Sequence, residues 1–260
     1  MAVPRTRLVI ANWKLNPNTV GKAKELFLAL RKEASRRHRV ETVIAAPFPY
    51  LAELRKLTTG VHTKLGAQDV FWEKSGTHTG EVSVPMLASV GVSHVLIGHS
   101  ERRALGETDE DVARKASATV RGGLTAVVCV GETSRDTQGQ YLSVVEEQVQ
   151  RACADIPKPM LARLVIAYEP VWAISGGDGK GETATPADVH EMVIFIRRIL
   201  TGRFGRSVAA RVPILYGGSV SDENAASMLS EGMVDGLLVG GASLTPRPFA
   251  AILSAANEQH

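Results

Sequence analysis

The sequence predicts an α/β fold, a single-domain (β/α)8 barrel spanning residues 1–260. Short apolar runs alternate with longer helical patterns from one end of the chain to the other. Each run is apolar at nearly every position, which is typical of parallel strands covered on both faces by helices. Eight such strand–helix units follow one another, and that number closes most economically as a barrel.

An open, doubly wound sheet is the alternative architecture. Dinucleotide-binding sheets of that kind carry Gly-x-Gly-x-x-Gly directly after the first strand. The first apolar run of this chain is followed instead by Asn12–Lys14, so the alternative lacks its main support. No linker or shift in composition divides the chain into two domains.

The predicted strands are the short apolar runs, many of them β-branched. Pro47 and Pro49 stop the second run, because proline has no N–H to donate to a ladder. In chain order, we expect strands at Leu8–Ala11, Thr42–Ala46, Lys64–Ala67, His94–Ile97, Thr125–Val130, Leu164–Tyr168, Val212–Tyr216 and Gly236–Val239.

The predicted helices show helical spacing of apolar residues and recognisable ends. Thr185 followed by Pro186, for example, is a cap followed by a proline in the first turn. We expect helices at Val20–Ser35, Tyr50–Leu57, Pro85–Val90, Asp109–Arg121, Tyr141–Ala154, Thr185–Gly202 and Asp222–Ser230, and a last one from Pro246.

Composition excludes several classes of function. Hydrophobic residues make up 44% of the chain and charged residues 22%, which is ordinary for a globular enzyme. The formal net charge of +3 is too small and too dispersed to predict a nucleic-acid partner. Cys129 and Cys153 do not indicate a disulfide scaffold. Because the chain shows neither an apolar leader nor a bilayer-length apolar run, we expect a cytoplasmic protein without a membrane partner.

Polar residues crowd the positions that follow the predicted strands. Taken singly, each is an ordinary surface residue. Barrels of this kind build their sites from the loops at the carboxyl ends of the strands, and random surface polarity would not choose that end. The residues concerned are Asn12, Lys14, His99, Glu101, Glu132, Glu169, Ser219, Gly240 and Gly241.

Two glycine pairs after the last two strands predict a phosphate site. Gly217–Gly218, beside Ser219, and Gly240–Gly241 expose backbone N–H groups to which an anion can come close. Barrels often bind phosphate after strands seven and eight. The histidines show no ligand spacing with carboxylates, so we expect neither a metal nor another cofactor.

Glu169 ends an apolar strand and precedes a stiff Pro170–Trp172. The glycine-dense stretch Ser175–Gly181 comes directly afterwards. This order predicts a base held at the end of a rigid strand, with a lid attached behind it.

These motifs together resemble the triosephosphate isomerase family. They occur in the family's order and cover nearly the whole chain. The resemblance implies a TIM barrel that interconverts dihydroxyacetone phosphate and D-glyceraldehyde 3-phosphate through an enediolate. The motifs are Asn12–Lys14, Ile97–Arg103, Gly106–Glu110, Cys129–Glu132, Ala167–Ile174, Leu215–Val220 and Val239–Leu244.

The resemblance also implies roles for the site residues. Glu169 is the expected base, and His99 the neutral electrophile, whose place at a helix start favours the uncharged ring. Lys14 offsets the developing charge. Asn12 orients the substrate, and Glu101 pairs with Lys14.

By the same resemblance, the phosphate is held by Ser219, Gly240, Gly241 and one lid glycine, Gly176 or Gly177. Tyr216 and Ser219 match residues that hold the closed lid. The residues that match those holding it open are Glu132, Tyr168 and Trp172.

A homodimer is implied as well, through the long polar loop Gln68–Val82. Gln68 and Thr79 match the contact residues of this loop in the family. Glu81 and Arg102 match an ion pair between subunits.

The chain departs from the family pattern at three places. Ser175 replaces the first glycine of the lid, and the lid tip, Gly176–Glu182, is a few residues longer. His78 stands where the dimer loop has Phe or Tyr. Ser134–Asp136 replaces the usual acidic and basic run after Glu132.

Two alternative functions follow. A longer lid suits a substrate with one more carbon, which favours an isomerase of a four-carbon ketose phosphate such as L-erythrulose 1-phosphate. A non-catalytic paralogue that only binds a sugar phosphate could lose Lys14, His99 or Glu169, but all three are present.

Overall fold

The computed structural model describes residues 6–58, 63–174 and 183–258, which contain a closed barrel of eight parallel strands. The strands follow one another around the barrel in chain order, and β8 pairs with β1 to close it. The predicted α/β barrel is therefore confirmed. Its strands are β1 (Arg7–Asn12), β2 (Val40–Ala46), β3 (Thr63–Ala67), β4 (Val92–Ile97), β5 (Thr125–Val130), β6 (Leu164–Tyr168), β7 (Ile214–Tyr216) and β8 (Gly236–Val239).

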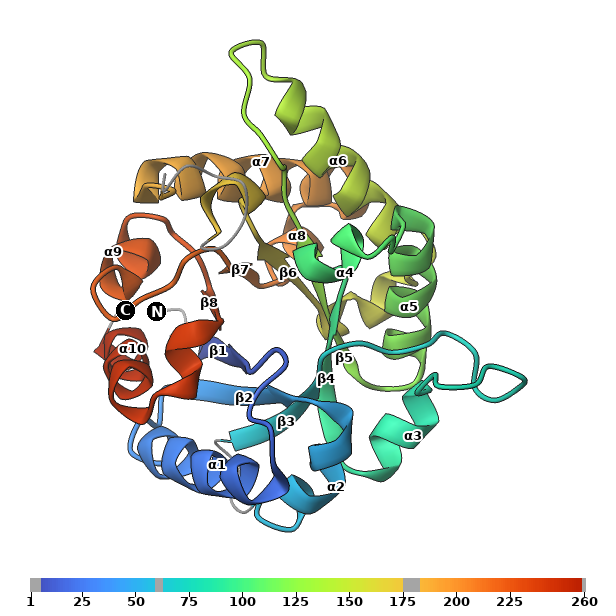
Figure 1. The fold of residues 1–260 in the computed structure, drawn as a ribbon. Helices are drawn as coiled ribbons and strands as arrows, with labels where there is room; N and C mark the ends of the chain where they lie inside the picture. The colour runs from blue at the N-terminus through green and yellow to red at the C-terminus, as the bar shows by residue number, and fades with distance from the viewer. Residues whose placement is uncertain (1–5, 59–62, 175–182, 259–260) are drawn as a thin grey trace.

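Helices form a ring around the strands, as seen along the barrel in Figure 1. Eight of them correspond to the predicted helices: α1 (Val20–Ala34), α2 (Phe48–Arg55), α3 (Val84–Ser89), α5 (Asp109–Arg121), α6 (Gln140–Ala152), α7 (Pro186–Phe204), α9 (Ala225–Ser230) and α10 (Pro246–Glu258). None of the helices in the described part of the chain is both long and apolar enough to cross a bilayer.

Several short helical segments are not among the helices predicted from the sequence, although a helix start at His99 was expected from the resemblance. Each has six residues or fewer, which is too short for a helical period to show in the sequence. They are α4 (Ser100–Ala104), α8 (Arg206–Ala209) and the 3-10 helices η1 (Lys158–Arg163), η2 (Val171–Ala173) and η3 (Gly241–Leu244).

Two predicted elements begin later than expected. β7 starts at Ile214, because Pro213 has no N–H and contributes only its carbonyl, which accepts from the Ile166 N–H at 3.0 Å. The helix expected from Asp222 begins at Ala225. The Asn224 side chain holds a turn ahead of it by accepting from the Ser221 N–H at 2.9 Å.

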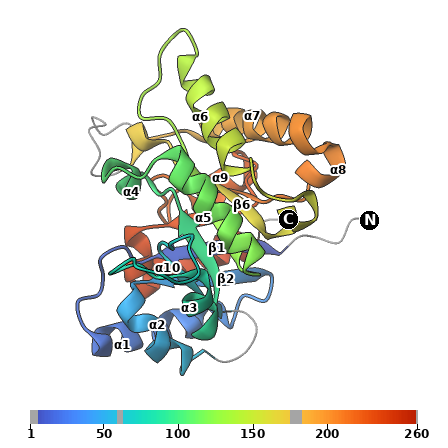
Figure 2. The same ribbon diagram turned by 90° about the vertical axis from the view of Figure 1, so that its right-hand side faces the viewer.

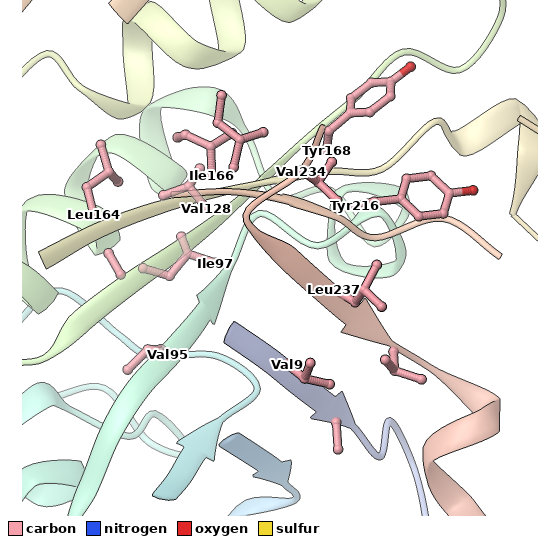
Figure 3. Close-up of a cluster of buried hydrophobic side chains, with 14 of the residues drawn as sticks. Val9, Val95, Ile97, Val128, Leu164, Ile166, Tyr168, Tyr216, Val234 and Leu237 are labelled. Carbon is pink, nitrogen blue, oxygen red and sulfur yellow. The ribbon is translucent and has the colours of Figure 1, made fainter. Parts of the chain in front are cut away.

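The core has two apolar layers. Side chains such as Ile10, Val127 and Leu215 fill the barrel interior. The alternate residues of the same strands pack outward against the helices. Figure 3 shows part of this outer layer, with Val9, Ile166 and Tyr168 among its members. Because side chains alternate along a strand, this division decides which residues reach the mouth of the barrel.

The alternation carries two polar residues into the site. Leu8 and Ile10 point into the barrel, and Asn12 follows in the same register. Val165 and Ala167 also point inward, and Glu169 follows them. The side view in Figure 2 shows α4, which begins right after β4, at one end of the barrel and α8, which precedes β7, at the other. We call the α4 end the carboxyl end.

Candidate active site

Glu169 is a buried carboxylate at the carboxyl end, with 2% of its surface exposed. Its backbone N–H donates to the Val130 carbonyl at 2.8 Å, which extends the ladder beyond β6. Gly131 faces it so closely that an added Cβ would lie 1.8 Å from the Glu169 carbonyl oxygen. Only glycine therefore fits at position 131, and the neighbouring strand can approach the backbone of Glu169.

The two carboxylate oxygens of Glu169 have different surroundings. Oε2 accepts from the backbone N–H of Ser100 at 3.1 Å. Oε1 lies 3.3 Å from Nε2 of His99 and has no hydrogen-bond partner among the described residues. A buried oxygen without a partner is costly unless something else binds it, so Oε1 is available to a ligand.

His99 caps the amino terminus of α4. Its Nδ1 accepts from the backbone N–H of Glu101 at 3.2 Å. When one nitrogen of a neutral imidazole accepts, the other carries the proton. In the neutral ring the proton is therefore on Nε2, the nitrogen that faces Glu169. The ring is 8% exposed and can present an N–H to an oxygen at the barrel mouth.

Lys14 lies across the mouth in a rare backbone conformation. Its φ is 52°, a region that non-glycine residues seldom occupy. The side-chain oxygen of Asn12 accepts from its N–H at 3.0 Å, and Gln68 donates to its carbonyl at 3.0 Å. Nζ lies 2.8 Å from Oε1 of Glu101. The Lys14–Glu101 pair implied by the resemblance is thus present, and Asn12 acts on the backbone of Lys14.

The glycine loop after β8 lies beside Lys14. A Cβ added to Gly240 would lie 3.4 Å from the Cε of Lys14, whereas one added to Gly241 would meet nothing within 4 Å. The loop therefore borders open space next to a cation. Such a place is compatible with an anion, and the phosphate site stays a prediction from the sequence.

Ser219 and Tyr216 lie on the β7 side of the same mouth. The Ser219 hydroxyl donates to the Ala173 carbonyl at 2.8 Å, just ahead of the predicted lid. Burial raises the pKa of Tyr216 to about 12, so its hydroxyl stays protonated at neutral pH. Gly218 packs against that hydroxyl, and an added Cβ would lie 2.4 Å from it. Gly176 and Gly177, predicted as phosphate ligands, lie outside the described residues.

A polar cluster holds the chain on both sides of Glu169. Oε1 of Glu132, a residue only 1% exposed, accepts from the Tyr168 hydroxyl and the Trp172 indole N–H, each at 2.8 Å. The Glu132 carbonyl accepts from the Val171 N–H at 3.0 Å. Burial and the charge of Glu132 raise the pKa of Tyr168 well above its usual value, which keeps the phenol a donor.

Arg135 joins this cluster, a contact that the sequence did not predict. Its Nε donates to Oε1 of Glu132 at 3.0 Å. Burial works against its charge, yet the bonds to Glu132 and Tyr168 raise the pKa of Arg135 above its usual value. The only signal in the sequence was the departure from the family pattern at Ser134–Asp136. Ser100 was also missed, because its contribution is a backbone N–H.

A cavity of about 300 Å³ opens beside Lys14, with Gln68, His99 and Arg102 in its walls. Leu15 and Leu105 border it and are 94% and 83% exposed. Among the described residues, no group of three or more His, Cys, Asp or Glu side chains is arranged to hold a metal ion.

Comparison with known proteins identifies the family. The family model described as triosephosphate isomerase matches residues 7–256. Proteins named triosephosphate isomerase from Idiomarina loihiensis and Moorella thermoacetica are each 44% identical to this chain. The alignments cover 98% and 96% of this chain, and 99% and 98% of the respective relatives. A third, from an Azoarcus species, is 45% identical over 96% of this chain and 99% of its own length. The chain, with its carboxylate and imidazole facing each other at the mouth of the barrel, belongs to the triosephosphate isomerase family.

Proposed function

We propose that this protein interconverts dihydroxyacetone phosphate and D-glyceraldehyde 3-phosphate, with Glu169 as the base. One observation carries the assignment of the base: Glu169 is buried and lies 3.3 Å from His99, with one carboxylate oxygen unpartnered among the described residues. A carboxylate suits the reaction because it can take a proton from one carbon and return it to the next.

His99 serves as the electrophile in this proposal. Its Nδ1 is occupied by the Glu101 N–H, which leaves Nε2–H to donate to the substrate oxygens. Donation from a neutral ring polarises the carbonyl and stabilises the enediolate that follows. The same ring can pass a proton between the two neighbouring oxygens.

Lys14 and the glycine loop bind the phosphate end. The Lys14 side chain runs beside Gly240, and its charge offsets that of both the phosphate and the enediolate. Gly240, Gly241 and Ser219 contribute backbone N–H groups and a hydroxyl. Asn12 holds the backbone of Lys14, and Glu101 holds its ammonium group.

The described hinge has the contacts that the resemblance assigns to an open lid. Tyr168 and Trp172 both donate to Glu132, and Glu169 accepts from the Ser100 N–H. To act on a substrate, the Glu169 carboxylate would give up its hydrogen bond from the Ser100 N–H and turn toward a proton bound to a substrate carbon. Closure would exclude water from the enediolate, which protects it from side reactions.

The activity assay compares specificity constants for glyceraldehyde 3-phosphate and L-erythrulose 1-phosphate. We expect a clear preference for the three-carbon substrate, in agreement with the names of the relatives. A preference for the four-carbon ketose phosphate would contradict the proposal, and binding without turnover of either would support the non-catalytic alternative.

We also propose a homodimer formed through the loop Gln68–Val82. The exposed Leu15 and Leu105 border a cavity beside Lys14, and a partner's loop would cover them. His78 packs against Phe71 with ring centroids 4.5 Å apart, so it takes an aromatic place within the loop. Arg102 pairs with Asp69 of its own chain at 2.9 Å and would reach the partner's loop with its remaining N–H groups.

Sedimentation measurements test the dimer. At micromolar concentration we expect the mass of two chains, and a monomer at that concentration would contradict the proposal. A cytoplasmic location stays a prediction from the sequence.

A further inference from the structure

Arg135 is largely buried, with 19% of its side chain exposed, and it contacts three parts of the chain. Nε donates to Glu132 at 3.0 Å, and one terminal nitrogen donates to the Tyr168 hydroxyl at 3.2 Å. The other donates to Oδ1 of Asp188 at 2.9 Å. The guanidinium carbon also lies 5.2 Å from the centre of the Trp172 ring, within the range of a cation–π contact.

Arg135 is the cation beside the buried carboxylate of Glu132. The Glu132 side chain is 1% exposed, and its second oxygen has no partner among the described residues. Burying a charge is costly unless the charge is paired. Arg135 supplies that counter-charge, and its planar group allows it to bind the neighbouring acceptors at the same time.

Glu132 in turn holds the chain on both sides of Glu169. Tyr168 precedes the base and donates to the Glu132 carboxylate, as does Trp172, which follows it. Val171 donates to the Glu132 carbonyl. Any shift of the Glu132 carboxylate therefore moves Tyr168 and Trp172, which lie on either side of Glu169 in the chain.

Asp188 connects the same cluster to α7. It completes a capping box with Thr185 at the start of that helix, and it accepts from Arg135. Arg135 therefore joins the loop after β5, the hinge after β6 and the first turn of α7. Figure 1 shows α6 and α7 side by side.

We propose that Arg135 is a positioning residue for Glu169. It fixes the position of the Glu132 carboxylate, so that Tyr168 and Trp172 hold the base-bearing segment in place, and it ties this segment to α7 through Asp188. This inference rests on the proposed function, because it assigns Glu169 as the base. Arg135 contacts neither His99 nor Lys14 in any described interaction, so its effect on catalysis passes through Glu132 and through its own contacts with Tyr168 and Trp172.

The first test is the Arg135→Met variant. We expect kcat to fall about 10-fold, since small displacements of a reacting group are costly, with KM within twofold of the wild type because the phosphate-binding residues are untouched. Arg135→Lys keeps the charge but loses the planar guanidinium group that binds several acceptors at once. We expect its kcat to lie between that of Arg135→Met and that of the wild type. A folded Arg135→Met protein with unchanged kcat would overturn the proposal.

A double variant separates positioning from general stability. Arg135→Met combined with Glu132→Gln removes both charges, and the amide oxygen can still accept from Tyr168 and Trp172. We expect this pair to recover most of the lost kcat, and no recovery in a folded double variant would refute the mechanism. If Arg135→Met alone does not fold, Arg135→Gln takes its place, and a wild-type kcat in the folded Arg135→Gln protein has the same refuting force.

A control and a spectroscopic readout complete the design. Arg37→Met removes an equally buried arginine that pairs with Glu33 at 2.7 Å and reaches Ser254, and it should leave kcat unchanged. Tryptophan emission should shift in Arg135→Met but not when the same change is made in a Trp172→Phe background. An emission shift that persists in the Trp172→Phe background would show that the change does not act at Trp172. Wild-type turnover tests the proposed function separately, since the variants are judged only relative to it.

Discussion

The two ends of the barrel carry similar buried polar side chains but hold them differently. At the carboxyl end, Oε1 of Glu169 faces His99 without a hydrogen-bond partner among the described residues. At the amino end, His94 is 6% exposed, with Nδ1 2.9 Å from the Ser93 hydroxyl and Nε2 3.5 Å from Glu41. Asp235 at that end accepts from the Ile214 N–H at 2.9 Å.

The difference separates binding from stability. Polar groups that are satisfied within the protein contribute to folding and have little left to offer a ligand. A buried acceptor left open costs stability and is retained where a ligand completes it. Substitutions at the carboxyl end should therefore change activity more than stability, and those at the amino end should do the reverse.

The largest expected effect is at Glu169. Glu169→Asp withdraws the carboxylate by about one methylene, and we expect kcat to fall roughly 10²-fold, because an error of ~1 Å at the reacting centre can cost that much. Steady-state kinetics measures it. Glu41→Asp makes the same shortening at the amino end and should leave kcat unchanged. Near-normal activity of Glu169→Asp would remove Glu169 from the role of base.

The next effect concerns the amino end and depends on pH. Burial lowers the pKa of His94 to about 4, while Glu41 opposes the shift and Lys64 adds to it. The unfolded chain takes up this proton near pH 6.5, so stability present above that pH is lost as the pH falls toward 4. Between pH 7 and pH 5, protonation of His94 in the unfolded chain lowers the free energy of unfolding by up to about 2 kcal/mol.

Urea unfolding of His94→Gln at the two pH values measures this contribution. The variant should lose less stability on acidification than the wild type, with unchanged kcat at pH 7. His38→Gln, at an exposed position, is the control and should behave as the wild type does. Equal acid sensitivity of His94→Gln and the wild type would show that the two ends do not differ in this way.

The smallest expected effect is at Ser219. Ser219→Ala removes a hydroxyl that now donates to the Ala173 carbonyl and that we place on the phosphate. We expect inorganic phosphate to bind about 10-fold more weakly, because one hydrogen bond to a charged group is lost. Titration calorimetry measures this affinity. Ser254→Ala on α10 is the control. Unchanged affinity would remove Ser219 from the phosphate site.

Much of the fold could be predicted because its signals are local. The apolar runs that became β5, β6 and β8 have the predicted bounds. The cap at Thr185 and the proline after it begin α7 as expected. Elements without a local period were not predicted, as was the case for α8, and of α4 only the start at His99 was expected. The start of α9 was also missed, because a side-chain bond from Asn224 decides it.

The residues proposed for the candidate site come from the sequence and the family resemblance, as does the Lys14–Glu101 pair, whereas other contacts could not be predicted. Parallel strands bring their carboxyl ends to one edge, so Asn12, His99 and Glu169 could be placed together in advance. The direction that each carboxylate oxygen of Glu169 takes could not be predicted. It depends on the backbone of Ser100, 69 residues away along the chain.

The barrel, the end that bears the site and the family could all be predicted from the sequence alone. These follow from strand alternation and from motifs that are contiguous in the chain. The folded chain was needed to show that the Ser100 backbone meets Glu169 across 69 residues and that Arg135 reaches Asp188 across 53. Such contacts join groups that are far apart in the chain, and the closure of the barrel sets the distance between them. In the sequence, Ser134–Asp136 is only a difference from the family pattern. In the folded protein, Arg135 of this stretch contacts Glu132 and Tyr168.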